Sequence, residues 1–214
     1  MKKTKKLLAC LIAAATMFTM GSTAFAAEAD ATPADQETVT IHKQYKLIGQ
    51  GISPKETFTL EQVGNGTVTD GDADNAPHLG KITGATFEKG AATADGVTGD
   101  ITIELPGYEK VGVYEYTLHE VDGNNAGVTY YGNNIKLVVT VIQGENGKLR
   151  VAAVHTEAEG EKSDTFTNTY SAGKLNISKT VKGNLGDQSK YFEFKVTLTG
   201  EKGKTYASSY AVSV

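Results

Sequence analysis

Cysteine is scarce in this chain of 214 residues, because Cys10 is the only one. Cys10 lies in a stretch typical of a secretory signal, with a lysine-rich start, an apolar run over residues 7–20 and a cleavage site at Ala24-Phe25-Ala26. We therefore expect residues 1–26 to be removed, so that the mature chain begins at Ala27. Without cysteine, that chain cannot form the disulfides common in secreted proteins. Its core or another covalent device must stabilise it.

Positive charge is also scarce once the signal is removed. Residues 1–26 carry four lysines and no acidic residue, so their loss changes the formal net charge from −4 to −8. A chain this acidic is poorly suited to nucleic acid or to an anionic membrane, and we expect neither as a partner. No later apolar run is long enough to span a bilayer, so no membrane contact is expected after signal removal.

Motifs for catalysis or metal binding are absent as well. The four histidines are scattered, and no nucleophile elbow or metal-ligand spacing occurs, which argues against a secreted hydrolase. The spacing Asp70-x-Asp72-x-Asp74 resembles the start of a calcium loop. However, Asn75 stands where glycine is required, and Lys81 stands where the bidentate glutamate belongs. We interpret residues 70–80 as a solvated loop and expect neither a metal nor a cofactor.

Helical periodicity is missing too, and what the chain has instead is many short strands with turn signals between them. This pattern predicts an all-β sandwich over residues 38–172, preceded by a disordered acidic leader over residues 27–37. The expected strands cover residues 38–45, 58–60, 85–87, 101–105, 113–121, 135–142, 149–154 and 166–170.

Three of these strands carry a polar residue on their apolar face. Side chains two apart in a strand point the same way, so Lys43 falls on the face of Val39 and Ile41. By the same alternation, Glu120 and Asn168 fall on the apolar faces of their own strands, whereas Lys46 and Glu115 fall on the opposite faces. Charged residues are almost never fully buried without a partner, so Lys43, Glu120 and Asn168 together suggest a site.

These residue types allow a specific reaction, in which a lysine amine attacks an asparagine carboxamide, releases ammonia and leaves an isopeptide bond. Burial can lower a lysine pKa by up to ~3–5 units, which would make Lys43 a nucleophile. A packed strand pair would hold Asn168 within reach, and a neutral Glu120 would relay the proton to the departing ammonia. Strand parity alone leaves an alternative open, namely a buried Lys–Glu salt bridge with Asn168 hydrogen-bonded nearby.

The end of the chain repeats its beginning. Lys179 is followed by Phe194 at the same separation as Lys43 by Phe58, which indicates two tandem domains of one kind. We expect strands over residues 175–181 and 192–198, and a third over residues 206–214. Residues 173–214 would then be an incomplete second domain, because this length is marginal for a core. We expect the chain to be a piece of a longer protein.

Three motifs resemble a known family. They are Gly112-Val113-Tyr114-Glu115-Tyr116-Thr117-Leu118-His119-Glu120, then Gly127-Val128-Thr129-Tyr130-Tyr131, and finally Phe166-Thr167-Asn168-Thr169-Tyr170. In this order they resemble the major backbone pilins of Gram-positive sortase-assembled pili, in particular the streptococcal pilin isopeptide-linkage domain. The resemblance implies an immunoglobulin-like (CnaB-like) fold, with an isopeptide bond between Lys43 and Asn168 that Glu120 helps to form. It also implies that Lys179 is the isopeptide lysine of the second domain.

The same resemblance implies a function. The chain would be a structural pilus shaft subunit on the cell surface, polymerised by a pilin sortase to other pilin subunits. Lys162, which lies shortly before the asparagine strand, is the candidate for the sortase linkage, and the alternative for it is an ordinary solvated lysine. The alternative function is a cell-wall-anchored adhesin that binds a host surface ligand through the same fold. An isopeptide bond forms once, so we do not expect an enzyme.

Overall fold

The computed structural model describes residues 36–71, 73–144, 147–173, 175–183, 186–187 and 189–208. The expected signal peptide and all but the last two residues of the expected leader lie outside these ranges. The regular elements of the described residues are strands: β1 (Thr38–Gly49), β2 (Glu56–Phe58), β3 (Leu60–Gln62), β4 (Thr67–Gly71), β5 (Ile82–Thr83), β6 (Ala85–Phe87), β7 (Val97–Glu104), β8 (Gly112–Glu120), β9 (Val128–Thr129), β10 (Ile135–Gln143), β11 (Leu149–Ala158), β12 (Glu161–Lys162) and β13 (Thr165–Ala172).

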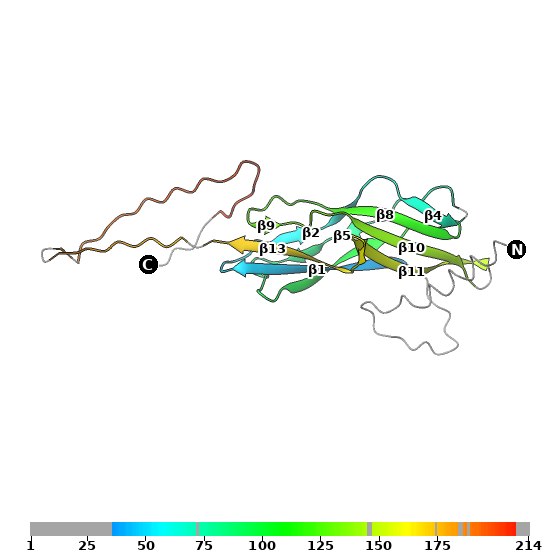
Figure 1. Cartoon of the computed structure of the whole chain (residues 1–214), viewed down its shortest axis with the longest axis horizontal. Helices are drawn as coiled ribbons and strands as arrows, with labels where there is room; N and C mark the ends of the chain where they lie inside the picture. Colours follow the sequence, from blue (N-terminus) through cyan, green and yellow to red (C-terminus); the bar gives the residue numbers. More distant parts are fainter. Residues whose placement is uncertain are drawn as a thin grey trace.

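Two larger sheets form the body of the molecule. One has the strand order β5-β7-β1-β13-β9, and the other has the order β12-β11-β10-β8-β3, with β4 also paired to β8. The short strands β2 and β6 form a third, two-stranded sheet. Within the first sheet, β1 pairs with β7 in an antiparallel and with β13 in a parallel arrangement. The first and last strands of the sandwich are therefore neighbours, and both point toward the end from which residues 173–208 continue (Figure 1).

The core lies between the sheets because the strands alternate in polarity, as the sequence predicts for a half-buried strand. In β1 the buried apolar side chains are Val39, Ile41 and Tyr45. In the opposite sheet, β10 lies between β11 and β8 and contributes a run of mostly buried, largely β-branched side chains. Alternate side chains of β8 are buried as well. The predicted all-β sandwich is confirmed.

Several short strands differ from the prediction. No strand was expected between residues 154 and 166, but β11 continues to Ala158 and β12 follows it, because Glu157 pairs with Lys162 in a tight antiparallel turn. The bulge between Thr140 and Val141 and the two-residue strands β5 and β9 carry no clear alternation in the sequence. Patterns of two or three residues are too short to show a period.

The strands that we expected beyond β13 were predicted wrongly. The described residues of 175–181 and 192–198 form no strand, although their apolar side chains alternate as expected. Leu175 is 66% exposed and Leu198 is 63% exposed. In the described residues no second sheet covers these side chains, and strands without a covered apolar face are marginal.

Candidate functional site

Lys43, Glu120 and Asn168 meet at the centre of the sandwich. Lys43 lies on β1 opposite Phe166 of the parallel strand β13, so Asn168 follows two residues further on the same face. Glu120 is the last residue of β8, in the opposite sheet, where it pairs with Leu60. The lysine and the asparagine thus come from adjacent strands of one sheet, and the glutamate reaches them across the core.

One carboxylate oxygen joins the three side chains. Glu120 Oε1 lies 2.8 Å from Lys43 Nζ and accepts a hydrogen bond of 3.0 Å from Asn168 Nδ2. Nζ and Nδ2 both contact this oxygen. The separation between the amine and the carboxamide nitrogen therefore cannot exceed the sum of these two distances. The other oxygen, Oε2, accepts a hydrogen bond from the backbone N–H of Tyr131, which fixes the carboxylate.

Water is excluded from this cluster. Lys43 is 1% exposed, Glu120 2% and Asn168 0%. The ring of Phe58 lies 5.5 Å from Lys43 Nζ and that of Tyr131 lies 5.8 Å from it, so aromatic faces surround the amine. Asn168 Oδ1 has no hydrogen-bond partner although it is buried, and an unsatisfied buried acceptor of this kind is costly.

Burial lowers the pKa of Lys43 from its usual range, and this effect outweighs the opposing influence of Glu120. The Glu120 carboxylate raises the lysine pKa both through its charge and through its hydrogen bond. The neutral amine is therefore easier to reach here than in water, which is what a lysine nucleophile requires.

Sequence reasoning missed part of this site. Tyr131 supplies a backbone donor and an aromatic wall, and no side-chain pattern reveals a backbone donor. The rings of Tyr131 and Phe166 also pack against each other, tilted by 59° with their centroids 5.1 Å apart, and this closes the cluster on the side of β13. Phe58 was recognised only by its spacing from Lys43. Lys46 and Glu115 are only partly buried, on the faces opposite Lys43 and Glu120.

The other residues singled out in the sequence lie away from this cluster. Lys162 is exposed on β12. Lys179 is exposed as well, and its Nζ lies 5.4 Å from the ring of Phe192. In the loop with calcium-like spacing, Asp74 pairs with Lys110 at 3.0 Å, and Asp72 lies outside the described residues. Among the residues described, no group of three His, Cys, Asp or Glu is placed to hold a metal ion.

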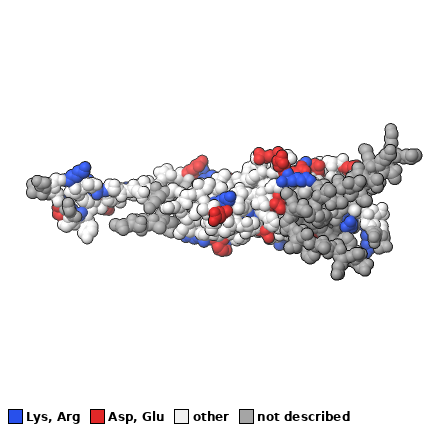
Figure 2. All heavy atoms as spheres, turned by 60° about the horizontal axis from the view of Figure 1, so that its bottom comes forward, with Lys and Arg blue, Asp and Glu red and all other residues white. Residues whose placement is uncertain are grey.

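The described residues on the face of the molecule shown in Figure 2 form no basic patch of the kind that binds nucleic acid. In the face shown in Figure 2, lysine, arginine and acidic side chains are scattered among uncharged atoms rather than gathered in one basic patch. The part of the chain that the structure covers has no helix with the length and hydropathy needed to cross a bilayer.

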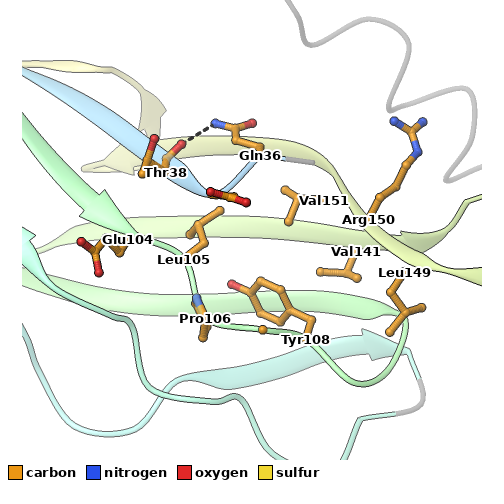
Figure 3. A pocket seen from close by; sticks show the side chains of 12 residues that line it. Gln36, Thr38, Glu104, Leu105, Pro106, Tyr108, Val141, Leu149, Arg150 and Val151 are labelled. Carbon is orange, nitrogen blue, oxygen red and sulfur yellow. Dashed lines mark hydrogen bonds between the residues drawn. The ribbon is translucent and has the colours of Figure 1, made fainter. Parts of the chain in front are cut away.

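A separate cavity of about 510 Å³ lies where β1 begins. Tyr108, Val141 and Leu149 line it, and Arg150 points away from them (Figure 3). None of the three buried site residues lines this cavity. It is therefore distinct from the Lys43 cluster.

Known proteins are similar to this chain in sequence. A family profile described as "Spy0128-like isopeptide containing domain" matches residues 18–171, and one for a domain of unknown function matches residues 173–214. A curated relative named "Pilin", from Streptococcus pyogenes serotype M1, is 29% identical over 170 residues, which is 75% of this chain and 49% of that protein. The chain thus spans about half the length of this relative.

Solved structures agree on the fold. The crystal structure of the major pilin from Streptococcus pyogenes has a TM-score of 0.59 at 23% identity, covering 73% of this chain and 58% of that one. A variant of that pilin with a glutamate replaced by alanine has a TM-score of 0.57 at 24% identity, covering 72% of this chain and 57% of that one. The fold is thus that of streptococcal major pilins, and the sequence match to the family profile covers most of the chain. This chain belongs to the family of Spy0128-like isopeptide-containing domains.

Proposed function

We propose that this chain is part of a pilus shaft subunit whose sandwich is locked by an isopeptide bond between Lys43 and Asn168. The single observation that carries this proposal is the buried contact of both side chains with one oxygen of Glu120. The alternative, a buried salt bridge with Asn168 hydrogen-bonded nearby, accounts for both contacts but leaves the unsatisfied Oδ1 of Asn168 unexplained.

The reaction balances with the groups present. Glu120 takes a proton from the Lys43 ammonium, and the neutral amine attacks the Asn168 carboxamide carbon. As the new C–N bond forms, the lysine nitrogen gives up a second proton. Glu120 passes the two protons in turn to Nδ2, which leaves as ammonium when the old C–N bond breaks. Oε1 suits this relay because it contacts both the nitrogen that loses a proton and the nitrogen that gains one. The process happens once per chain, so the protein is not an enzyme.

The place of the bond explains its use in a shaft. β1 enters the sandwich at one end and β13 leaves at the other, so a pulling force acts along two parallel neighbouring strands (Figure 1). A bond from Lys43 to Asn168 would pass that force directly from β1 to β13. The residues between them would then carry little load. Such a link resists reduction, which suits a secreted chain without cysteine in its mature part.

Within this proposal, the shaft lies on the cell surface and its partners are other pilin subunits and a pilin sortase. Lys162 is the proposed linkage residue, because it is exposed on the edge strand β12, close to the start of β13. Lys179 is the proposed isopeptide lysine of the second unit.

We expect a pilin sortase to join a fluorescent peptide that carries its sorting motif to this chain at Lys162. A Lys162→Arg variant should then lose nearly all of the label, because arginine keeps the charge but is not an amine nucleophile. Gel fluorescence measures the label, and Lys89→Arg, at another exposed lysine, is the matched control. Equal labelling of both variants would refute Lys162. No labelling of any lysine, together with binding of the purified chain to a host matrix protein, would favour an adhesin.

A further inference from the structure

A second buried carboxylate, Glu56 at the start of β2, lies outside the Lys43 cluster. It is 6% exposed and its partners are neutral donors. Oε1 accepts a hydrogen bond from the backbone N–H of Thr57, and Oε2 accepts one from the Tyr130 hydroxyl at 2.8 Å and one from Asn125 Nδ2. A carboxylate is suited to this place because both of its oxygens accept, whereas a carboxamide would turn a donor toward one of these groups.

Two of these partners lie near the loop over residues 122–126, between β8 and β9: Asn125 belongs to this loop, and Tyr130 directly follows β9. Asn125 points inward to Glu56, and its backbone N–H also meets the Tyr130 hydroxyl at 3.3 Å. Asn124 has a φ of 58°, a conformation that asparagine tolerates, and its N–H is held by Asp122 Oδ1 at 2.7 Å. With Asn125 held inward, the backbone groups of its two neighbours face outward, as they do on the edge of a sheet.

The chain's own C-terminal segment occupies this edge. Thr205 forms a parallel bridge with Asn125, in which its N–H donates to Asn124 O and its carbonyl accepts from the N–H of Ala126, both at 2.8 Å. Next to it, Lys204 Nζ lies 3.7 Å from Asp122 Oδ2. Two backbone hydrogen bonds and one charge pair thus connect residues that are about 80 positions apart in the chain.

We propose that the loop over residues 122–126 is a docking edge for the extended segment at Lys204 and Thr205, and that Glu56 holds the loop in the shape that receives it. The segment leaves the sandwich after β13, so docking gives it a second attachment besides the chain itself. Bending between the sandwich and this segment is thereby restrained, which fits a stiff junction between successive units of the proposed shaft. This contact is independent of the isopeptide bond, since it uses none of the three residues of that site.

Amide hydrogen exchange, followed by NMR on the chain from Ala27 onward, tests this proposal. We expect the Thr205 amide to exchange at least about tenfold more slowly than in an unstructured peptide, because its N–H is bonded to Asn124 O. Glu56→Gln should remove most of this protection, whereas Glu61→Gln, at an exposed carboxylate on the neighbouring strand β3, should leave it unchanged. Glu120→Ala should also leave it unchanged, which separates docking from the proposed bond.

Two results would overturn the proposal. One is a Thr205 amide that exchanges in the wild type as fast as in an unstructured peptide. The other is equal protection in Glu56→Gln and the wild type. If the Val139 amide in the core also loses its protection in Glu56→Gln, this variant does not keep the fold. The test is then made with Asp122→Ala instead. That exposed substitution removes the cap on Asn124 and the charge pair, so Thr205 should exchange faster while Val139 does not. An unchanged Thr205 would refute the docking edge.

Discussion

The Glu120→Ala variant is expected to be the least stable single variant of the buried cluster. By analogy with a disulfide that closes a loop of about 100 residues, loss of the isopeptide bond lowers the free energy of unfolding by roughly 4–5 kcal/mol. The variant also leaves the Lys43 amine buried without its carboxylate, at a cost of about 3–5 kcal/mol when the amine is charged. Since 1 kcal/mol shifts the Tm of a domain of this size by roughly 2–4 °C, calorimetry should show Tm lower by at least ~10 °C.

The matched control is Asn168→Ala, which prevents the bond but keeps the ion pair of Lys43 with Glu120. It should lose the contribution of the bond alone and so lie between the wild type and Glu120→Ala. If both variants have the wild-type Tm, no covalent bond stabilises the sandwich.

The difference in the free energy of unfolding between Glu120→Ala and Asn168→Ala should become smaller as pH rises. Burial lowers the pKa of Lys43 in the folded state, so between that pKa and the usual lysine range the unfolded chain binds more protons. The cost of the unpaired amine is therefore full at low pH and shrinks as pH rises through the folded-state pKa. In alkaline solution the stability of Glu120→Ala should approach that of Asn168→Ala. A gap that widened with rising pH would contradict a buried unpaired lysine.

The second large effect that we expect is on the extension of single molecules under a pulling force. With the bond in place, residues between Lys43 and Asn168 cannot extend, so the sandwich of the wild type should add almost no length when force is applied at its two ends. Without the bond, about 120 residues become free, and at about 3.3–3.6 Å per residue the chain should lengthen by roughly 40 nm.

Force spectroscopy on the wild type and on Asn168→Ala, with identical handles at both ends, measures this difference. Thr167→Ala, at the exposed neighbour of Asn168 on the other face of β13, serves as the control and should remain inextensible. An extension of equal length in the wild type and in Asn168→Ala would exclude the bond as the load-bearing link.

Much of the site could be predicted from the sequence, because strand alternation assigns a residue to a face. Lys43, Glu120 and Asn168 each interrupt an apolar face, and an expensive group on such a face needs a partner. Alternation does not assign sheet partners, however. The parallel pairing of β1 with β13 depends on contacts between residues more than 100 positions apart, which alternation along a single strand does not reveal.

Other features of the structure could not be predicted from the sequence, for physical reasons. Tyr131 acts through its backbone, which every residue carries, so no pattern distinguishes it. Glu56 shares a face with Phe58, and this parity would have revealed it if the strand had been extended to its true start. The strands expected over residues 175–181 and 192–198 failed for the opposite reason, because alternation shows which face is apolar but not whether anything covers it.

The intact mass of the purified chain from Ala27 onward tests the central claim most directly, measured beside Glu120→Ala. The bond predicts that the wild type lacks the mass of one ammonia, that the variant has its full calculated mass, and that a digest of the wild type contains one peptide joining Lys43 to Asn168. A wild type with its full calculated mass would show that the three residues form only a buried polar cluster, and the account of a covalently locked sandwich would be wrong.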